Sequence, residues 1–509
     1  MTVLVLGDGL THERGPVARR PDEPVLLLEA ESFARKLPYH PHKLVLVFSA
    51  MRQFRDDLRE QGRTVHYQQA ESFEEGLARH FAAHPGDELV AMRPASANAA
   101  DRLDDLITAH GGSIEFVENE TFLCSPDEFD QWAGERDGYR HEEFYRFMRR
   151  KTGYLMDGDE PVGGEWNYDD QNRETPGEDV DPPDPPAYRP DETTARVIEW
   201  VTETFEGSYD GPPYGGDWAD PEPFRWPVTR EDALDALESF CEDRLSEFGP
   251  YQDAMVDDEW GMYHALLSPA INLGLLHPAE VVERVIEAGE REDVPLNSVE
   301  GFVRQVIGWR EFVRHVYRRE MPELAGANQL DADEDLPPAY WTGETDMRCL
   351  DESVGSVRER GYAHHIQRLM VLSNFGLLYG VEPSQLNRWF HAGFVDAFHW
   401  VTTPNVVEMG LFGSGVFATK PYASSANYIN RMSDYCGNCP YYHTRTTGEG
   451  ACPFNALYWD FLDRNEDDLR SNHRMGLVYS HLDNKDEEEL ATIRERATKV
   501  KELAASGKL

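Results

Sequence analysis

The sequence predicts an N-terminal α/β domain with a doubly wound parallel sheet and a large all-α domain, joined by a long linker. Short apolar runs alternate with helical segments from Val3 to about Phe122, which is typical of a parallel sheet covered by helices. A stretch rich in proline, glycine and acidic residues follows, and after Thr229 the strand signal largely vanishes. A chain of 509 residues is long enough for several domains, and we expect them at 1–125, 126–228 and 229–509.

The first domain is expected to contain five buried strands and three amphipathic helices. The apolar runs that predict strands are Val3–Leu6, Val25–Leu28, Leu44–Phe48, Val65–Tyr67 and Leu89–Met92. The segments with helical periodicity are Met51–Gln61, Phe73–Ala83 and Ala97–His110. Gly7-Asp8-Gly9 follows the first run but lacks the full G-x-G-x-x-G pattern, so it predicts a turn at a strand end and not a dinucleotide loop.

The rest of the chain is expected to be helical after a linker. The stretch from Asp157 to Pro227 contains Pro182-Pro183-Asp184-Pro185-Pro186 and few apolar positions, with one helical segment near Thr193–Phe205. Apolar faces at helical spacing then predict helices at Glu231–Phe248, Pro278–Ala288, Ser298–Tyr317, Ser353–Tyr379, Pro383–Phe390 and Asp486–Leu503.

The net charge is strongly negative, because 49 Lys and Arg stand against 94 Asp and Glu, a formal charge of −45. Such a balance normally disfavours nucleic acids and anionic membranes. The acids are spread along the whole chain and lysine is scarce, which favours a halophilic surface whose repulsion is screened by multimolar salt. A local cationic site remains compatible with this surface. Arg146, Arg149, Arg150 and Lys151 form a basic patch that either balances local acids or contacts phosphate.

The sequence contains no apolar run near the roughly 18 residues of a membrane helix and no secretory signal. We therefore expect a cytoplasmic protein without membrane contact, most simply a monomer.

Three of the six cysteines are crowded into one loop-rich segment, Cys436-Gly-Asn-Cys439 and Cys452. A C-x-x-C redox pair would need a strand–helix context that is absent here. With a fourth thiolate, either zinc or an iron–sulfur cluster fits. The spacing chooses neither the metal nor the fourth ligand among Cys124, Cys241 and Cys349.

Several polar and aromatic residues of the helical domain are suggestive in combination. His365 and Arg368 lie three residues apart, hence on one helical face, and of the adjacent His364 and His365 only one is expected to enter a site. Asp396 stands among apolar neighbours and needs a cationic partner, for which Arg368 is the candidate. The tryptophans Trp341, Trp389 and Trp400 pack a core or relay electrons.

These residues carry a resemblance to a known family. Tyr362-Ala-His-His-Ile-Gln-Arg-Leu-Met370, Gly308-Trp-Arg-Glu311, Lys420-Pro-Tyr422 and Cys452-Pro-Phe-Asn-Ala-Leu-Tyr-Trp-Asp-Phe461 resemble the photolyase/cryptochrome superfamily, and more narrowly the iron–sulfur bacterial cryptochromes and prokaryotic (6-4) photolyases. The resemblance runs from the first strand to near the C-terminus. It implies an antenna-binding α/β domain and a helical domain that holds FAD and a [4Fe-4S] cluster.

The resemblance also implies a set of site residues. The cluster ligands are Cys349, Cys436, Cys439 and Cys452, and the antenna residues are Asp8, Glu31 and Phe48, with ribityllumazine expected and deazaflavin as the alternative. The flavin residues are His264, Leu267, Ser268, Asn272, Arg310, Arg368, Asp396 and Asn405.

The implied activity is light-driven repair of (6-4) pyrimidine photoproducts in damaged DNA. His365, with His364 beside it, is expected to donate a proton to the lesion, and Trp389 and Trp341 to transfer electrons. Family members often have Tyr after the first of these tryptophans, where this chain has Phe390. The alternative is a cryptochrome-type photoreceptor that signals to a protein partner through its flavin.

Overall fold

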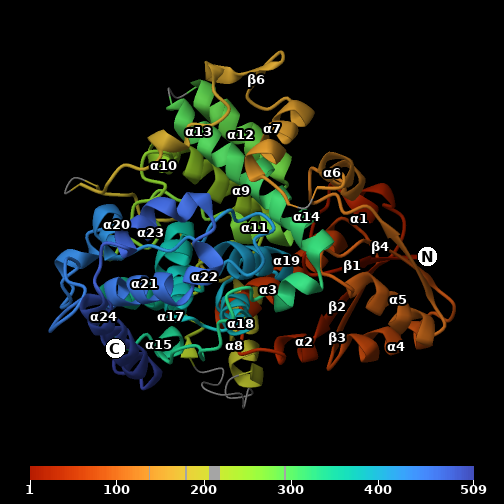
Figure 1. Cartoon of the computed structure of the whole chain (residues 1–509). Coiled ribbons are helices and arrows are strands. Elements are labelled where there is room, and N and C mark those ends of the chain that lie inside the picture. Colours follow the sequence, from red (N-terminus) through yellow and green to blue (C-terminus); the bar gives the residue numbers. More distant parts are fainter. Residues whose placement is uncertain (137, 178–179, 206–217, 292–293) are drawn as a thin grey trace.

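A five-stranded parallel sheet organises the N-terminal part of the chain (Figure 1). The computed structural model describes all residues except 137, 178–179, 206–217 and 292–293. The sheet has the order β3-β2-β1-β4-β5, and every neighbouring pair is parallel, so the chain reverses its direction of winding at β1. The strands are β1 (Thr2–Val5), β2 (Val25–Ala30), β3 (Val65–Ala70), β4 (Glu88–Met92) and β5 (Ser113–Val117).

Helices cover both faces of this sheet, which confirms the predicted doubly wound arrangement. They are α1 (Gly15–Arg19), α2 (Glu31–Ala34), α3 (Pro41–Glu60), α4 (Phe73–Ala83) and α5 (Ala99–Ala109). On one face, Leu77 and Phe81 of α4 and Ile107 of α5 form a small core with leucines of the strands. On the other face, Val3 and Val25 belong to the large core that continues into the helical part. Each fully buried Leu or Phe contributes about 1.5–3 kcal/mol.

The prediction of a strand at Leu44–Phe48 is wrong, because these residues lie inside α3. The helix begins after His40, whose ring accepts a hydrogen bond from the His42 amide, and has Pro41 in its first turn. Leu44, Val45, Leu46 and Phe48 are all buried, since α3 packs between the sheet and the helical part of the chain. A helix that is apolar on all sides gives the same continuous run of residues as a buried strand. The fifth strand of the sheet is β5, which the sequence analysis did not predict.

The connecting segment winds around the helical part and returns to α3. It contains α6 (Pro126–Ala133), α7 (His141–Thr152), the two-residue strands β6 (Met156–Asp157) and β7 (Glu160–Pro161), and α8 (Glu192–Phe205). The helix predicted at Thr193–Phe205 corresponds to α8, which lies along α3, with Trp200 edge-on to Phe48 at 5.0 Å between ring centroids.

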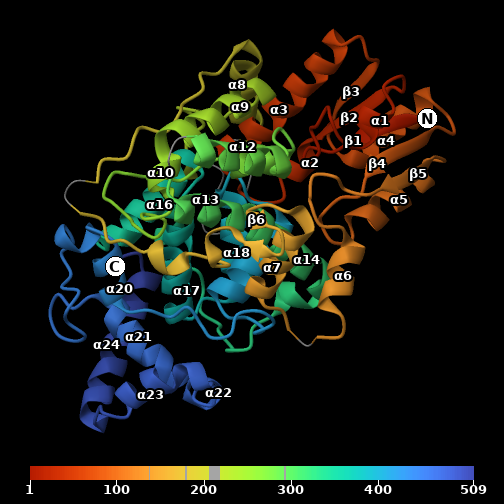
Figure 2. The ribbon, with the colours of Figure 1, turned by 90° about the horizontal axis from the view of Figure 1, so that it is seen from above.

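The C-terminal part is built from helices alone, apart from isolated bridges between single residues, in the part of the chain that the structure describes. Figure 2 shows these helices beside the sheet, with α21 to α24 farthest from it. The helices are α9 (Arg230–Ser239), α10 (Leu245–Phe248), α11 (Ser268–Leu273), α12 (Pro278–Arg291), α13 (Leu296–Val303), α14 (Glu311–Glu320), α15 (Ala339–Thr342), α16 (Arg348–Arg360), α17 (Asn374–Tyr379), α18 (Pro383–Gly393), α19 (His399–Thr403), α20 (Ala426–Met432), α21 (Pro453–Arg464), α22 (Glu466–Leu469), α23 (Gly476–Leu482) and α24 (Glu487–Ala505). None of the described helices combines the length and the apolar character that crossing a membrane requires.

The single helix predicted at Ser353–Tyr379 is interrupted. Helix α16 ends at Gly361, which has φ 64° and donates its amide to the Val357 carbonyl. A Cβ atom at this position would lie 2.7 Å from a methyl group of Val395, so the close approach requires glycine. Helical structure resumes at His365. The break therefore places His364 and His365 at the start of a new helical segment, with His364 buried and His365 partly exposed.

Candidate active site

A buried ion pair lies at the centre of the helical part. Arg368 donates two hydrogen bonds of 3.0 Å to the carboxylate of Asp396, which is only 6% exposed. The Ser268 hydroxyl donates a third, of 2.6 Å, and the Asn272 side chain donates to the Asp396 backbone carbonyl at 3.0 Å. The structure thus brings together four of the expected flavin residues, and the buried carboxylate has the partners that its charge requires.

Three imidazoles gather beside this ion pair. His264 and His364 stack with ring centroids 4.7 Å apart, and His365 lies edge-on to His264 at 5.4 Å. Both ring nitrogens of His364 and Nε2 of His264 are buried without a hydrogen-bond partner among the described residues. Burial, reinforced by the neighbouring imidazoles and Arg368, lowers the pKa of His264 and His364 well below the usual range. Both rings are therefore neutral and free to bond a ligand.

The backbone around His264 is strained. Met262 and Leu266 adopt positive φ values of 42° and 59°. Such conformations cost on the order of 1–3 kcal/mol in residues other than glycine and cluster at ligand sites, where the surrounding structure enforces them. The buried Leu267 then leads into α11, which carries Ser268 and Asn272. The strained turn is thus directly continuous with the residues that bond Asp396.

A second wall of the site contains Arg310 and Asn405. The Arg310 guanidinium is 3.1 Å from the Glu311 carboxylate and lies over the ring of Trp400. Burial lowers the pKa of Arg310 to about 10, so it stays protonated at neutral pH. The side-chain oxygen of Asn405 accepts a hydrogen bond of 3.0 Å from the indole of Trp309. These contacts hold both side chains in place before any ligand binds.

Insertions in four helices produce π-helical turns at this site. The described residues contain four such segments: η4 (Phe240–Arg244), η5 (Arg304–Arg310), η7 (Gln367–Ser373) and η8 (Pro404–Gly410). Each carries a polar side chain of the region: Arg244, Arg310, Arg368 and Asn405. Arg244 bonds the His264 carbonyl at 3.3 Å, and its second terminal nitrogen is buried without a partner among the described residues. Sequence periodicity did not reveal Arg244, because a π turn is common at functional sites but has no sequence signature.

His365 lies at the rim of the site, since its side chain is 44% exposed and its Nε2 atom is 3.4 Å from the Asp253 carboxylate. Aromatic, basic and acidic residues follow outward from Asp253. Tyr428 is close to Asp253, Arg173 and Arg431, and Tyr422 is close to Arg173 and Arg474. Arg431 and Arg474 are exposed and form no ion pair with any residue that the structure describes. Two exposed arginines without an acidic partner among the described residues therefore lie in this region, which also contains the carboxylates of Asp253 and Asp169.

The basic patch on α7 is largely committed to contacts within the chain. Arg149 is fully buried and donates to the carbonyls of Trp166 and Leu155. Arg146 pairs with Glu142, and Arg150 lies over the Trp166 ring at 4.5 Å. Lys151 pairs with Glu128 at 2.8 Å. Of the two interpretations of this patch, the structure favours the balancing of local acids over phosphate contact.

The two expected electron-transfer tryptophans lie in one aromatic cluster. The Trp389 indole is fully buried, donates to the Tyr340 carbonyl at 2.8 Å and packs edge-on to the Tyr340 ring. Trp341 follows Tyr340 directly and packs against Trp218 at 5.3 Å. On its inner side, Trp389 contacts Phe394, whose ring lies under the Arg368 guanidinium at 4.4 Å. Aromatic contacts therefore extend from the ion pair toward Trp218.

The four cysteines named above, Cys349, Cys436, Cys439 and Cys452, line one small cavity. Burial and the neighbouring thiols raise the pKa of Cys349, and burial raises that of Cys452 to about 12 and that of Cys436 to about 11. These thiols therefore favour the protonated form unless a cation offsets the charge of the thiolates. Cys124 and Cys241 are buried elsewhere.

The cysteine cavity is linked to the three imidazoles. Tyr435 lines the cavity, and its hydroxyl accepts a hydrogen bond of 3.0 Å from the Gln367 side chain. The oxygen of the same side chain accepts one of 3.2 Å from the backbone amide of His364. Gln367 therefore connects the wall of the cavity to the start of the segment that carries the histidines.

The three expected antenna residues are placed apart. Asp8 lines a cavity at the C-terminal ends of β1 and β4, where the sheet order reverses, and burial raises its pKa. Glu31 is half-buried on α2 and pairs with Arg35. Phe48, on α3, packs against Trp200 of α8. Neither lines the cavity of Asp8.

Comparison with known proteins shows the family of this chain. The deoxyribodipyrimidine photo-lyase-related protein family matches residues 3–216. The (6-4) photolyase of Agrobacterium fabrum is 40% identical to this chain over 487 residues, which is 94% of each protein. The chain belongs to the photolyase/cryptochrome superfamily, in its prokaryotic (6-4) branch.

Two solved structures of the superfamily share the fold. A bacterial class III photolyase from Agrobacterium tumefaciens matches with a TM-score of 0.61 and 17% identity, covering 99% of this chain and 96% of that one. The cryptochrome of Synechocystis sp. PCC6803 matches with a TM-score of 0.62 and 12% identity, covering 98% of each chain. At these identities the comparison shows the fold alone.

The superfamily implies FAD, and the residues at the ion pair fit it. FAD is an anionic ligand with many hydrogen-bonding atoms. Buried nitrogens of Arg244, His264 and His364 have no partner among the described residues, and such groups are costly unless a ligand bonds them. These donors lie next to the Asp396 carboxylate and the strained turn.

Proposed function

We propose that this protein is a light-driven DNA repair enzyme that acts on (6-4) pyrimidine photoproducts. The observation that carries the proposal is the position of His365, a half-exposed imidazole paired with Asp253 at the mouth of the site formed by Arg368 and Asp396. A similar (6-4) photolyase, 40% identical over nearly the whole chain, supports the same activity.

We assign flavin binding to His264, Leu267, Ser268, Asn272, Arg310, Arg368, Asp396 and Asn405, and we add Arg244 to this proposal because one of its buried nitrogens has no partner among the described residues. Bound FAD, when reduced and excited by light, would supply the electron that opens the lesion. Ser268 and Arg368 fix the Asp396 carboxylate, which is largely buried. Trp389 and Trp341 would carry electrons through the aromatic cluster.

The His365 ring is the proposed proton donor. Its Nδ1–H would protonate the hydroxyl group of the lesion, whose oxygen returns to the second pyrimidine as the bond between the two bases breaks. The electron then returns, so the step is redox-neutral. Asp253, which lies 3.4 Å from Nε2, would orient the ring. His364 is neutral and buried, so its proposed part is to position His365 and bond the cofactor. Repair requires the lesion to leave the base stack, which costs least for a damaged base.

Damaged DNA would bind at the rim around His365. Arg431 and Arg474 are free to contact phosphates, and Tyr422, which is 42% exposed, offers a ring for base stacking. With a net charge of −45, these few cations matter only where salt screens the remaining surface, so we propose that the enzyme is salt-adapted.

We propose that the cysteine cavity holds a [4Fe-4S] cluster. All four cysteines line one small cavity, and four cysteine thiolates are the usual ligand set of such a cluster. Antenna binding, with ribityllumazine as the first candidate and deazaflavin as the alternative, is proposed for the α/β domain on the resemblance alone.

A repair assay tests the activity. Holoprotein in multimolar KCl is given oligonucleotides with either a (6-4) photoproduct or a cyclobutane dimer, in blue light and in darkness. We expect light-dependent loss of the (6-4) lesion, reduced about 10²- to 10⁴-fold in His365→Asn and unchanged in His481→Asn, which alters an exposed histidine on α23. Absence of turnover despite bound, photoreducible FAD would overturn the proposal and favour a photoreceptor.

A further inference from the structure

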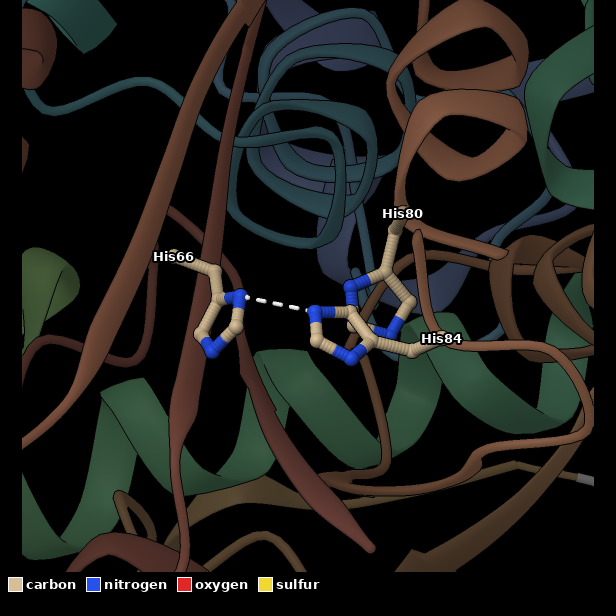
Figure 3. Close-up of side chains that lie close together, drawn as sticks. All are labelled: His66, His80 and His84. Carbon is tan, nitrogen blue, oxygen red and sulfur yellow. Dashed lines mark hydrogen bonds between the residues drawn. The ribbon is translucent and has the colours of Figure 1, made fainter. Parts of the chain in front are cut away.

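Three histidines of the α/β domain face one another at the edge of the sheet (Figure 3). His66 lies on the edge strand β3, and His80 and His84 lie one helical turn apart at the end of α4. One ring nitrogen from each lies within 4.8 Å of the other two. The group is separate from the candidate active site, because α4 packs on the sheet face whose core excludes the helical part.

One nitrogen of His80 is buried without a partner. The residue is only 1% exposed, and its Nε2 atom is 3.0 Å from a carboxylate oxygen of Asp87. That carboxylate also accepts a hydrogen bond of 2.6 Å from the Thr2 hydroxyl. The opposite nitrogen, Nδ1, has no partner among the described residues and faces the other two rings (Figure 3). A carboxylate on one nitrogen that fixes the other for a metal ion is the usual arrangement of metal-binding histidines.

The spacing of the nitrogens matches a tetrahedral ion. His84 Nε2 and His66 Nδ1 are 3.2 Å apart. Zinc–nitrogen bonds of 2.0–2.1 Å place two ligands of a tetrahedral ion about 3.3–3.4 Å apart. The two rings therefore stand close to the separation that an ion requires, and the third nitrogen lies beside them.

The site is also open to solvent on one side. His66 and His84 are partly exposed, so water can reach a fourth position on the ion.

We propose that His66, His80 and His84 bind one divalent first-row transition metal ion, with zinc as the first candidate. Imidazole ligands suit zinc, copper and nickel and disfavour magnesium and calcium. The ion would tie the end of α4 to the edge strand β3 and would be independent of the flavin and of the cysteine cavity.

Zinc binding to the holoprotein tests this proposal. The full chain is dialysed against Zn²⁺, bound zinc is counted by elemental analysis beside iron, and X-ray absorption at the zinc edge reports the ligand atoms. We expect one zinc per chain with nitrogen or oxygen ligands near 2.0 Å. Asp87→Asn should weaken zinc binding about 10- to 100-fold, since it removes the carboxylate that orients His80.

His84→Ala and His66→Gln keep the test independent of folding, because both side chains are partly exposed. Each should abolish stoichiometric zinc, while His110→Ala, at the end of α5, should leave it unchanged. The proposal is overturned if both variants retain wild-type zinc, if the wild type retains none, or if the bound zinc shows sulfur ligands near 2.3 Å, which would place it at the cysteines.

Discussion

Replacing Asp396 by Asn tests whether the buried ion pair holds the centre of the helical domain. The substitution keeps the shape of the side chain but removes the charge that accepts two hydrogen bonds from Arg368 and one from Ser268. Removal of one partner from a buried pair typically costs about 3–5 kcal/mol. Since the Arg368 side chain keeps 22% exposure, we expect the lower end, a loss of about 3 kcal/mol in the free energy of unfolding.

The assay is urea unfolding of holoprotein at constant KCl, followed by far-ultraviolet circular dichroism. Asp483→Asn is the matched control, because Asp483 also accepts two hydrogen bonds from one arginine, Arg470, but the pair is exposed. This control should unfold like the wild type. Arg368→Gln combined with Asp396→Asn should cost little more than either change alone. The reasoning is refuted if Asp396→Asn shifts the transition no further than Asp483→Asn does, or if the two changes at the ion pair add in full.

Three further outcomes are expected. Trp389→Phe should slow flavin photoreduction in blue light by an order of magnitude, measured as the loss of absorbance of the oxidised flavin. An unchanged rate would remove Trp389 from the electron route. Burial lowers the pKa of His42 to about 4 and that of His141 to about 3. Below pH 6.5 the unfolded state therefore binds more protons than the folded state, and the free energy of unfolding decreases as the pH is lowered. At pH 5.5 each of these two histidines should lower the free energy of unfolding by about 1.4 kcal/mol relative to neutral pH. Equal calorimetric melting temperatures at pH 7.5 and 5.5 would contradict this. Cys349→Ser should lower the iron content of the purified protein, and Cys241→Ser should not; equal iron in both would exclude Cys349 as a ligand.

Many residues of the candidate site could be predicted from the sequence, but not how they are brought together. It pointed to a partner for Asp396 because an isolated charge among apolar residues is costly, and the structure places Arg368 there. It grouped three cysteines by their spacing alone. The position of Cys349 beside them depends on how α16 packs against the C-terminal loops, which no local pattern encodes.

The parts that the sequence did not predict depend on long-range packing. The stretch Leu44–Phe48 of α3 was mistaken for a strand because its residues form a continuous apolar run that is largely buried. Gly361 ends α16 at a point where Val395, from elsewhere in the chain, leaves no room for a Cβ atom. The unpartnered Arg244 nitrogen and the facing rings of His66 and His80 arise where distant segments meet.

The sequence by itself determined the class of the fold, since strand and helix periodicities are local consequences of which side chains face a core. It also determined the negative surface and the identities of the groups that perform chemistry. Only the tertiary structure decided which of these groups meet. Burial, hydrogen bonding and pKa depend on the neighbours that packing brings from elsewhere in the chain, and a single interrupted helix or π turn redirects a side chain entirely.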